Sequence, residues 1–133
     1  MATTTAKITL TSTDLLSDTL DFTQSASVTA SHTTGMARAA VTSTAKATAS
    51  GQVTLYTGDD YAAIAYLYIK NTNGTAANKI YIYDDTSTAD PIFMQLAGGD
   101  WAWVPMHGDK TLKAYAPNGS NPIMEWMVVG TDQ

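Results

Sequence analysis

The sequence predicts an all-β fold: a single-domain antiparallel β-sandwich, jelly-roll-like, of roughly eight to ten strands. Two observations lead to this prediction. Apolar and polar residues alternate with a period of two in most segments, as in half-buried strands, rather than with the helical period of 3.6. Gly, Asn, Pro and Asp separate these segments at intervals of about 8 to 12 residues. A chain of 133 residues without a break in composition fits one domain, residues 1–133.

The N-terminal part of the chain is rich in Thr, Ala and Ser and nearly free of aromatic residues. Residues 7–12 and 25–31 alternate as strands do. Residues 14–22 fit either a short turn or the start of a strand. We expect residues 1–12 to extend as an N-terminal arm that adds a strand to a neighbouring chain.

Residues 36–49 form an Ala-rich segment whose composition also suits a helix. The segment has no wide apolar stripe, and it contains Val41, Thr42, Thr44 and Thr48, whose branched side chains favour strands. We therefore expect an extended strand or a strand pair here.

The strands are clearer in the rest of the chain, which holds every Tyr and Trp. The expected strands cover residues 52–56, 63–71, 79–85, 91–97, 101–105, 111–116 and 123–130. We interpret Gly98 and Gly99 as a hairpin turn. Pro105 is expected to end its strand, because proline lacks the N–H that a sheet needs.

One hairpin is predicted with particular clarity. The strands at 63–71 and 79–85 flank a loop that contains Asn-Gly, which favours a tight reversal. Antiparallel pairing of these two strands would place four phenol rings on a common face of one sheet. These rings are those of Tyr66, Tyr68, Tyr81 and Tyr83.

The composition argues against several classes of partner. Net charge is -5 and there is no Lys/Arg cluster, so we expect no binding to nucleic acid. No apolar run approaches the roughly 20 residues of a membrane span, and the start lacks the pattern of a signal peptide, so no membrane partner is expected. Charged residues make up 14% of the chain, against roughly 25% in typical soluble domains. Such sparse charge predicts a surface partly covered by neighbouring subunits.

The search for chemistry predicts no enzyme, no catalytic or metal-binding residue and no cofactor. The chain has no cysteine, and His32 and His107 lie far apart without ligand spacing. No serine lies in a Gly-x-Ser-x-Gly motif. The carboxylates of Asp84, Asp85 and Asp90 fit either a solvated turn, which we favour, or a calcium site.

Rows of aromatic residues are the main functional signal. Such rings serve as a sandwich core, as a subunit interface or as a platform on which sugar rings stack. We assign Trp126 to the core. The predicted interface residues are Tyr66, Tyr68, Tyr81, Tyr83, Trp101 and Trp103.

Four short motifs carry a family resemblance: "KIYIYDD", "FMQLAGGDWAWVP", "LKAYAPNG" and "MEWMVVG". Their succession resembles the C-terminal half of small β-sandwich virion structural proteins of tailed bacteriophages. The N-terminal "TSTDLLSDTLDF" is similar to marine and cyanobacterial phage structural proteins. The resemblance covers residues 78–130 well and the N-terminal third loosely.

The resemblance implies a non-enzymatic building block of the virion, made in the host cytoplasm. Its expected role is a capsid decoration or cement protein that stabilises the head by binding the major capsid protein at subunit junctions. A homo-oligomer is expected, with a trimer favoured. One alternative is a neck, tail or fibre-base component. An alternative of another class is a carbohydrate-binding module for host glycans.

Overall fold

The computed structural model describes residues 2–14, 18–58, 60–61, 64–85 and 92–131. In these residues the chain forms eleven β-strands and no helix, and every strand pairing is antiparallel. The predicted all-β class is confirmed, with slightly more strands than expected. The chain divides into two compact units, residues 1–30 and 31–133. The prediction of one domain over the whole chain stays a prediction.

The first unit is a long β-hairpin. Strand β1 (Ala2–Ser12) pairs with β2 (Leu20–Ala30) over their full length, without a register shift. The segment expected as a single extended arm is therefore one strand of a two-stranded ribbon. Of the ambiguous segment 14–22, residues 20–22 belong to β2, and residues 15–17 lie outside the described residues.

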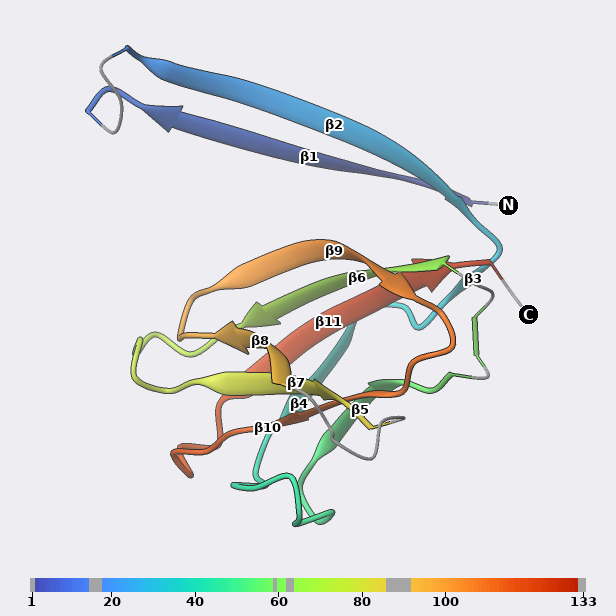
Figure 1. Ribbon diagram of the computed structural model, residues 1–133, viewed down its shortest axis with the longest axis vertical. Coiled ribbons are helices and arrows are strands. Elements are labelled where there is room, and N and C mark those ends of the chain that lie inside the picture. The colour runs from blue at the N-terminus through green and yellow to red at the C-terminus, as the bar shows by residue number, and fades with distance from the viewer. Residues whose placement is uncertain (1, 15–17, 59, 62–63, 86–91, 132–133) are drawn as a thin grey trace. The chain divides into compact units, whose positions relative to one another are not determined.

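The second unit is a sandwich of two sheets (Figure 1). One sheet has the order β5-β10-β7-β8; the other has the order β3-β11-β6-β9, with β4 also paired to β11. The strands are β3 (His32–Thr33), β4 (Ala37–Ala40), β5 (Val53–Tyr56), β6 (Ile64–Asn71), β7 (Ile80–Asp84), β8 (Ile92–Leu96), β9 (Trp101–His107), β10 (Leu112–Tyr115) and β11 (Ile123–Gly130).

The strand pairs of the sandwich are nested. Strand β7 pairs with β8, β6 with β9, β5 with β10 and β4 with β11. The sandwich is thus one long hairpin, folded so that its successive pairs alternate between two sheets. This nesting of eight strands is the jelly-roll arrangement, as the sequence predicted.

The nesting corrects several local predictions. The segments 63–71 and 79–85 are not a hairpin, because β6 and β7 lie in different sheets. Gly98 and Gly99 are likewise not a hairpin turn, because their loop joins β8 of one sheet to β9 of the other. Pro105 lies inside β9 rather than at its end, and β9 is an edge strand, where a missing N–H is tolerated.

The Ala-rich segment 36–49 is extended only in part. It contains strand β4, and turns follow from residue 45 onward. Strand β4 pairs with β11 and packs Ala37 and Ala39 against the core.

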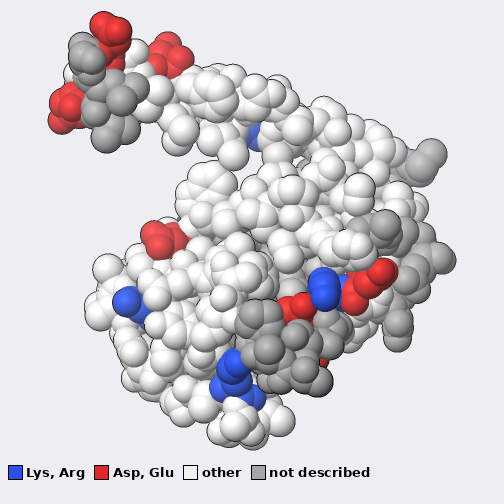
Figure 2. Space-filling view, in the orientation of Figure 1, with Lys and Arg blue, Asp and Glu red and all other residues white. Residues whose placement is uncertain are grey.

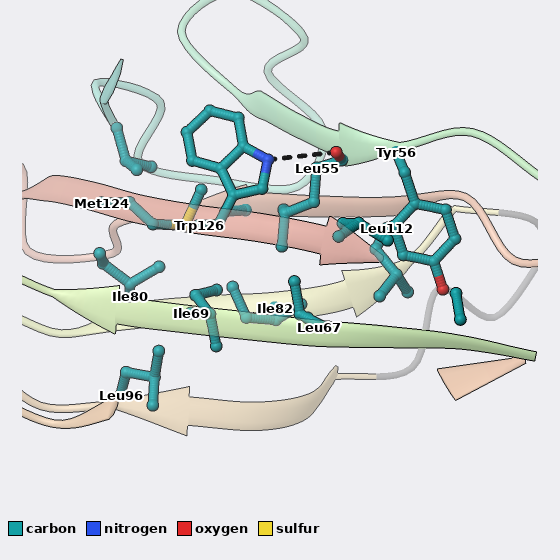
Figure 3. Close-up of a cluster of buried hydrophobic side chains, with 14 of the residues drawn as sticks. Leu55, Tyr56, Leu67, Ile69, Ile80, Ile82, Leu96, Leu112, Met124 and Trp126 are labelled. Atoms are coloured by element: carbon teal, nitrogen blue, oxygen red, sulfur yellow. Dashed lines mark hydrogen bonds between the residues drawn. The ribbon is translucent and has the colours of Figure 1, made fainter. Parts of the chain in front are cut away.

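The core lies between the two sheets (Figure 3). The sheet of β6 and β11 contributes Leu67 and Ile69, and the opposite sheet contributes Ile80 and Ile82. Trp126 is buried, as predicted, and its Nε1 donates a hydrogen bond to the carbonyl oxygen of Leu55 at 3.2 Å. This bond ties β11 to β5 and satisfies the one polar atom of the indole.

Candidate functional site: an aromatic sheet face

The outer face of the five-stranded sheet carries a group of aromatic side chains. The central strand of this face is β6, which runs between β9 and β11. Leu67 and Ile69 of β6 belong to the core. Because side chains alternate along a strand, Tyr66 and Tyr68 point to the opposite, outer side.

The neighbouring edge strand β9 places further rings beside these tyrosines. Tyr68 pairs with Trp103, and Tyr66 pairs with Pro105. The rings of Tyr66 and Trp103 stack diagonally, with centroids 5.9 Å apart and 19° between their planes. Trp101 lies on the same side of β9 as Trp103, two residues along the strand.

We call this group the aromatic face; it consists of Tyr66, Tyr68, Trp101, Trp103, Pro105 and Met127. Trp101 keeps 54% of its surface exposed, and Tyr66, Tyr68 and Trp103 are half-buried. Charged side chains are few over the visible side of the molecule, and several carboxylates gather at the tip of the hairpin (Figure 2). The exposed ring of Trp101 and the half-buried rings beside it are therefore the part of this face that a partner could contact.

Strand β11 completes the face and limits it at one end. Met127 pairs with Tyr68, and Glu125 pairs with Lys70. The hydroxyl of Tyr68 donates a hydrogen bond to Glu125 Oε1 at 3.2 Å. Burial and this hydrogen bond raise the pKa of Tyr68.

Two of the predicted interface residues lie elsewhere. Tyr81 and Tyr83 are on β7, so they point outward from the opposite sheet. Tyr83 is 1% exposed, and its hydroxyl donates to Gln52 Oε1 at 2.9 Å while Lys46 lies over its ring. The connection between β4 and β5, which carries Lys46 and Gln52, therefore covers Tyr83. The common face predicted for the four tyrosines does not form, because their strands belong to different sheets.

The structure adds two residues that sequence reasoning did not select. Pro105 was expected at a strand end, and Met127 lies within the strand expected at residues 123–130. The alternation within residues 123–130 already placed Met127 and Glu125 on one side. What the sequence lacked was the order β11-β6-β9, which brings Met127 next to Tyr68.

The described residues contain no cluster of three or more His, Asp or Glu side chains that could hold a metal ion. The ring of His32 packs edge-on against buried Tyr61, with centroids 4.9 Å apart. His107 is exposed, and its Nδ1 lies 3.6 Å from an Asp109 carboxylate oxygen. These contacts position the two imidazole rings.

The acidic residues at the end of β7 form ion pairs with lysines. Asp84 forms an ion pair with Lys110 at 3.1 Å, and Asp85 forms one with Lys113. Asp90, the third candidate calcium ligand, lies outside the described residues. Two carboxylates that already have cationic partners are less available to a divalent ion.

Comparisons with known proteins identify no relative: no protein-family model, no curated protein and no solved structure matches the chain. No helix long and apolar enough to cross a membrane occurs among the described residues.

Proposed function

We propose that this chain is a non-enzymatic structural protein of a phage virion, and that it decorates the capsid by docking its aromatic face onto other virion proteins. One observation carries the proposal. Trp101 is 54% exposed beside the stacked pair Tyr66–Trp103, on the outer face of a rigid sheet. The phage part of the proposal rests on the resemblance of four motifs in residues 78–130 to structural proteins of tailed phages.

Exposed rings on a sheet suit protein binding for energetic reasons. Trp and Tyr bury large areas and lose few rotamers, because each has two side-chain torsions. The sheet holds Tyr66 and Trp103 in place before binding, so these side chains lose little conformational entropy when a partner binds. Burying the exposed part of Trp101 would contribute about 2–3 kcal/mol.

A decoration protein can work with modest contacts. Each copy binds through one face, and the symmetry of a shell repeats that contact many times. Jelly rolls occur in viral capsid proteins and in lectins alike, so the fold supports the proposal without selecting it.

The first test is the protein composition of purified particles from a phage that encodes the chain. Quantitative mass spectrometry should find it in the particle, in hundreds of copies for decoration or in about a dozen for a neck, tail or fibre-base component. Its absence from particles would overturn the virion role.

The second test measures binding of the recombinant chain to capsids assembled without it. Trp101→Ala should weaken binding about 30-fold or more, since each 1.4 kcal/mol corresponds to tenfold. Phe93→Ala is the matched control, because Phe93 is 43% exposed but lies on β8 of the other sheet. Equal effects of the two variants would exclude the aromatic face as the binding surface.

A carbohydrate-binding module is the second candidate. The flat stacked pair Tyr66–Trp103 and the exposed Trp101 favour it, because sugar rings stack on such surfaces. Lys70 and Glu125 at the end of the face supply polar groups for sugar hydroxyls. Glycan binding on an array that is lost in Trp101→Ala and kept in Phe93→Ala would favour this function over decoration.

A further inference from the structure

The hairpin β1–β2 has two chemically different faces. In an antiparallel pair, residues directly opposite each other point to the same side. One side carries hydroxyl residues, and two pairs of them are hydrogen-bonded through their side chains: Thr5 with Ser27 and Thr9 with Thr23. The other side, which we call the apolar hairpin face, carries the register pairs Ala6–Ala26, Ile8–Gln24 and Leu10–Phe22.

Toward its tip the apolar hairpin face is open to solvent, whereas Val28 and Ala30, on the same side of the ribbon nearer its base, are buried. Leu10 is 51% exposed, Phe22 46% and Ile8 37%. A two-stranded ribbon is marginally stable in water unless a further layer covers its apolar side. The exposed part of this face, at Ile8, Leu10 and Phe22, therefore calls for a partner.

The size of the side chains changes along the face in a specific way. The pair Ile8–Gln24 lies in the middle. Two residues toward the tip, the pair Leu10–Phe22 is large; two residues toward the base, the pair Ala6–Ala26 is small. Large and small positions are thus arranged at equal distances on either side of one pair.

We propose that the apolar hairpin face is covered by the same face of a second copy of this chain, related by a two-fold axis at the pair Ile8–Gln24. The axis lies between the two ribbons and perpendicular to their strands. Leu10 then packs on the partner subunit's Ala6, and Phe22 packs on the partner subunit's Ala26. Gln24 meets the partner subunit's Gln24, so its amide has a hydrogen-bonding partner.

Size and charge both favour a second copy as the occupant. On either side of the central pair, large side chains meet small ones, which is how two layers interdigitate without voids. None of the six residues in these pairs carries a charge, so two identical faces meet without repulsion. A contact in which one patch binds its own copy is the usual form of a symmetric dimer.

The proposed interface is small, so the affinity of the two copies for each other should be low. The strands of eleven residues span about 37 Å, and the face offers fewer side chains than the roughly 20–30 per partner of a standard interface. We therefore expect a dimer that dissociates on dilution. The inference goes beyond the proposed function and does not rest on it, since it uses no residue of the aromatic face. A two-fold pair also differs from the trimer that the sequence favoured.

The first experiment uses disulfide formation in this cysteine-free chain. Gln24→Cys places one thiol beside its own counterpart, so oxidation should give a covalent dimer at least tenfold faster than in the control. The control is Thr23→Cys, an exposed neighbour on the hydroxyl face. Equal rates for the two variants, or no dimer from Gln24→Cys, would overturn the proposal.

The second experiment exchanges the large and small positions. Light scattering and sedimentation of the full chain should show a monomer–dimer equilibrium. Leu10→Ala removes a contact and Ala6→Leu overfills one, so each should weaken the dimer about tenfold. The double variant Ala6→Leu/Leu10→Ala restores the match of large with small and should recover most of the affinity.

Three results of the exchange experiment would contradict the pairing. A double variant as weak as the single variants would show that these positions do not face each other. A chain that stays monomeric at all concentrations would mean that its own sandwich or another molecule covers the hairpin. A trimer would exclude a two-fold contact of the hairpin faces.

Discussion

Tyr83 and Trp101 belong to the same kind of alternating aromatic pattern, yet their surroundings are opposite. Tyr83 is 1% exposed and hydrogen-bonded to Gln52, whereas Trp101 is 54% exposed. Both point away from the core between the sheets. The difference arises because the β4–β5 connection covers the outer side of β7, and the part of β9 that carries Trp101 has no such cover among the described residues.

The hydroxyl of Tyr83 provides the first test at the scale of single residues. Tyr83→Phe removes the donor to Gln52 and leaves a partly buried acceptor, so unfolding free energy should fall by about 1 kcal/mol. Tyr81→Phe is the matched control, because the half-buried Tyr81 makes no hydrogen bond through its hydroxyl to a described residue. Urea denaturation measures both; equal losses would show that the Gln52 contact contributes nothing.

Two buried phenols predict a loss of stability at high pH. Burial raises the pKa of Tyr56 to about 12 and that of Tyr61 to about 12, whereas a phenol in the unfolded chain ionises near 10. Their contribution is therefore complete below pH 10 and is lost as the pH rises from 10 to 12, because the unfolded chain gives up its protons first.

The measurement is the urea midpoint between pH 9 and pH 12. Tyr56→Phe keeps the edge-on contact with Tyr61 but has no proton to lose, so its stability should fall less over this range. The difference between wild type and variant should reach about 1–2 kcal/mol at pH 12. Parallel curves for the two proteins would show that Tyr56 ionises equally in the folded and unfolded states.

At the scale of elements, the loop between β8 and β9 requires a glycine at position 98 for a reason that the sequence pattern did not reveal. It crosses from one sheet to the other, and its backbone packs against the β6–β7 connection. A Cβ atom on Gly98 would collide with the carbonyl group of Thr75. Gly98 is therefore required by the close approach of two loops rather than by a hairpin turn.

This requirement predicts the effect of adding one methyl group. Gly98→Ala should lower unfolding free energy by about 1–3 kcal/mol, because backbone rather than a flexible side chain must move. Gly74→Ala, with no heavy atom within 4 Å of the added Cβ, should leave stability unchanged or raise it slightly. Thermal melts of both variants provide the measurement. Equal melting temperatures would mean that the two loops separate at little cost.

For the whole molecule, two compact units predict two levels of protection against hydrogen exchange. Strands β6 and β11 have paired strands on both sides and a buried core beneath them. Strands β1 and β2 each have one pairing partner. Amides of β1 and β2 should therefore exchange by local opening, at least a hundredfold faster than those of β6 and β11.

The exchange experiment needs protein dilute enough to keep the hairpins apart. The backbone amides of Leu10 and Phe22 report on the ribbon. The amides of Leu67 and Val128 report on the centre of the sandwich. Protection of all four amides to the same level would mean that the chain unfolds as one cooperative unit.

The positions of most strands could be predicted because alternation is local. Residues such as Val53 and Leu55, or Leu67 and Ile69, reveal a buried side through their spacing alone. The same spacing placed Tyr66 and Tyr68 on a common side of their strand before their neighbours were known. Uniform alternation over several short strands also led to the all-β class and the sandwich.

The pairing of strands could not be predicted in the same way. A short loop such as the one between β6 and β7 can join neighbours in one sheet or cross between two sheets, and neighbours in sequence usually pair. The four tyrosines were therefore assigned to one face, although Tyr66 and Tyr81 lie on opposite sheets.

By itself, then, the sequence determined that the chain forms strands, where most of them run and which side chains share a side of each. The tertiary structure decided which strands are neighbours and which outward sides are covered, and so which rings form the aromatic face. The reason is physical: alternation is set within a few residues of one strand, whereas pairing and cover depend on segments far apart in the chain that meet when it folds.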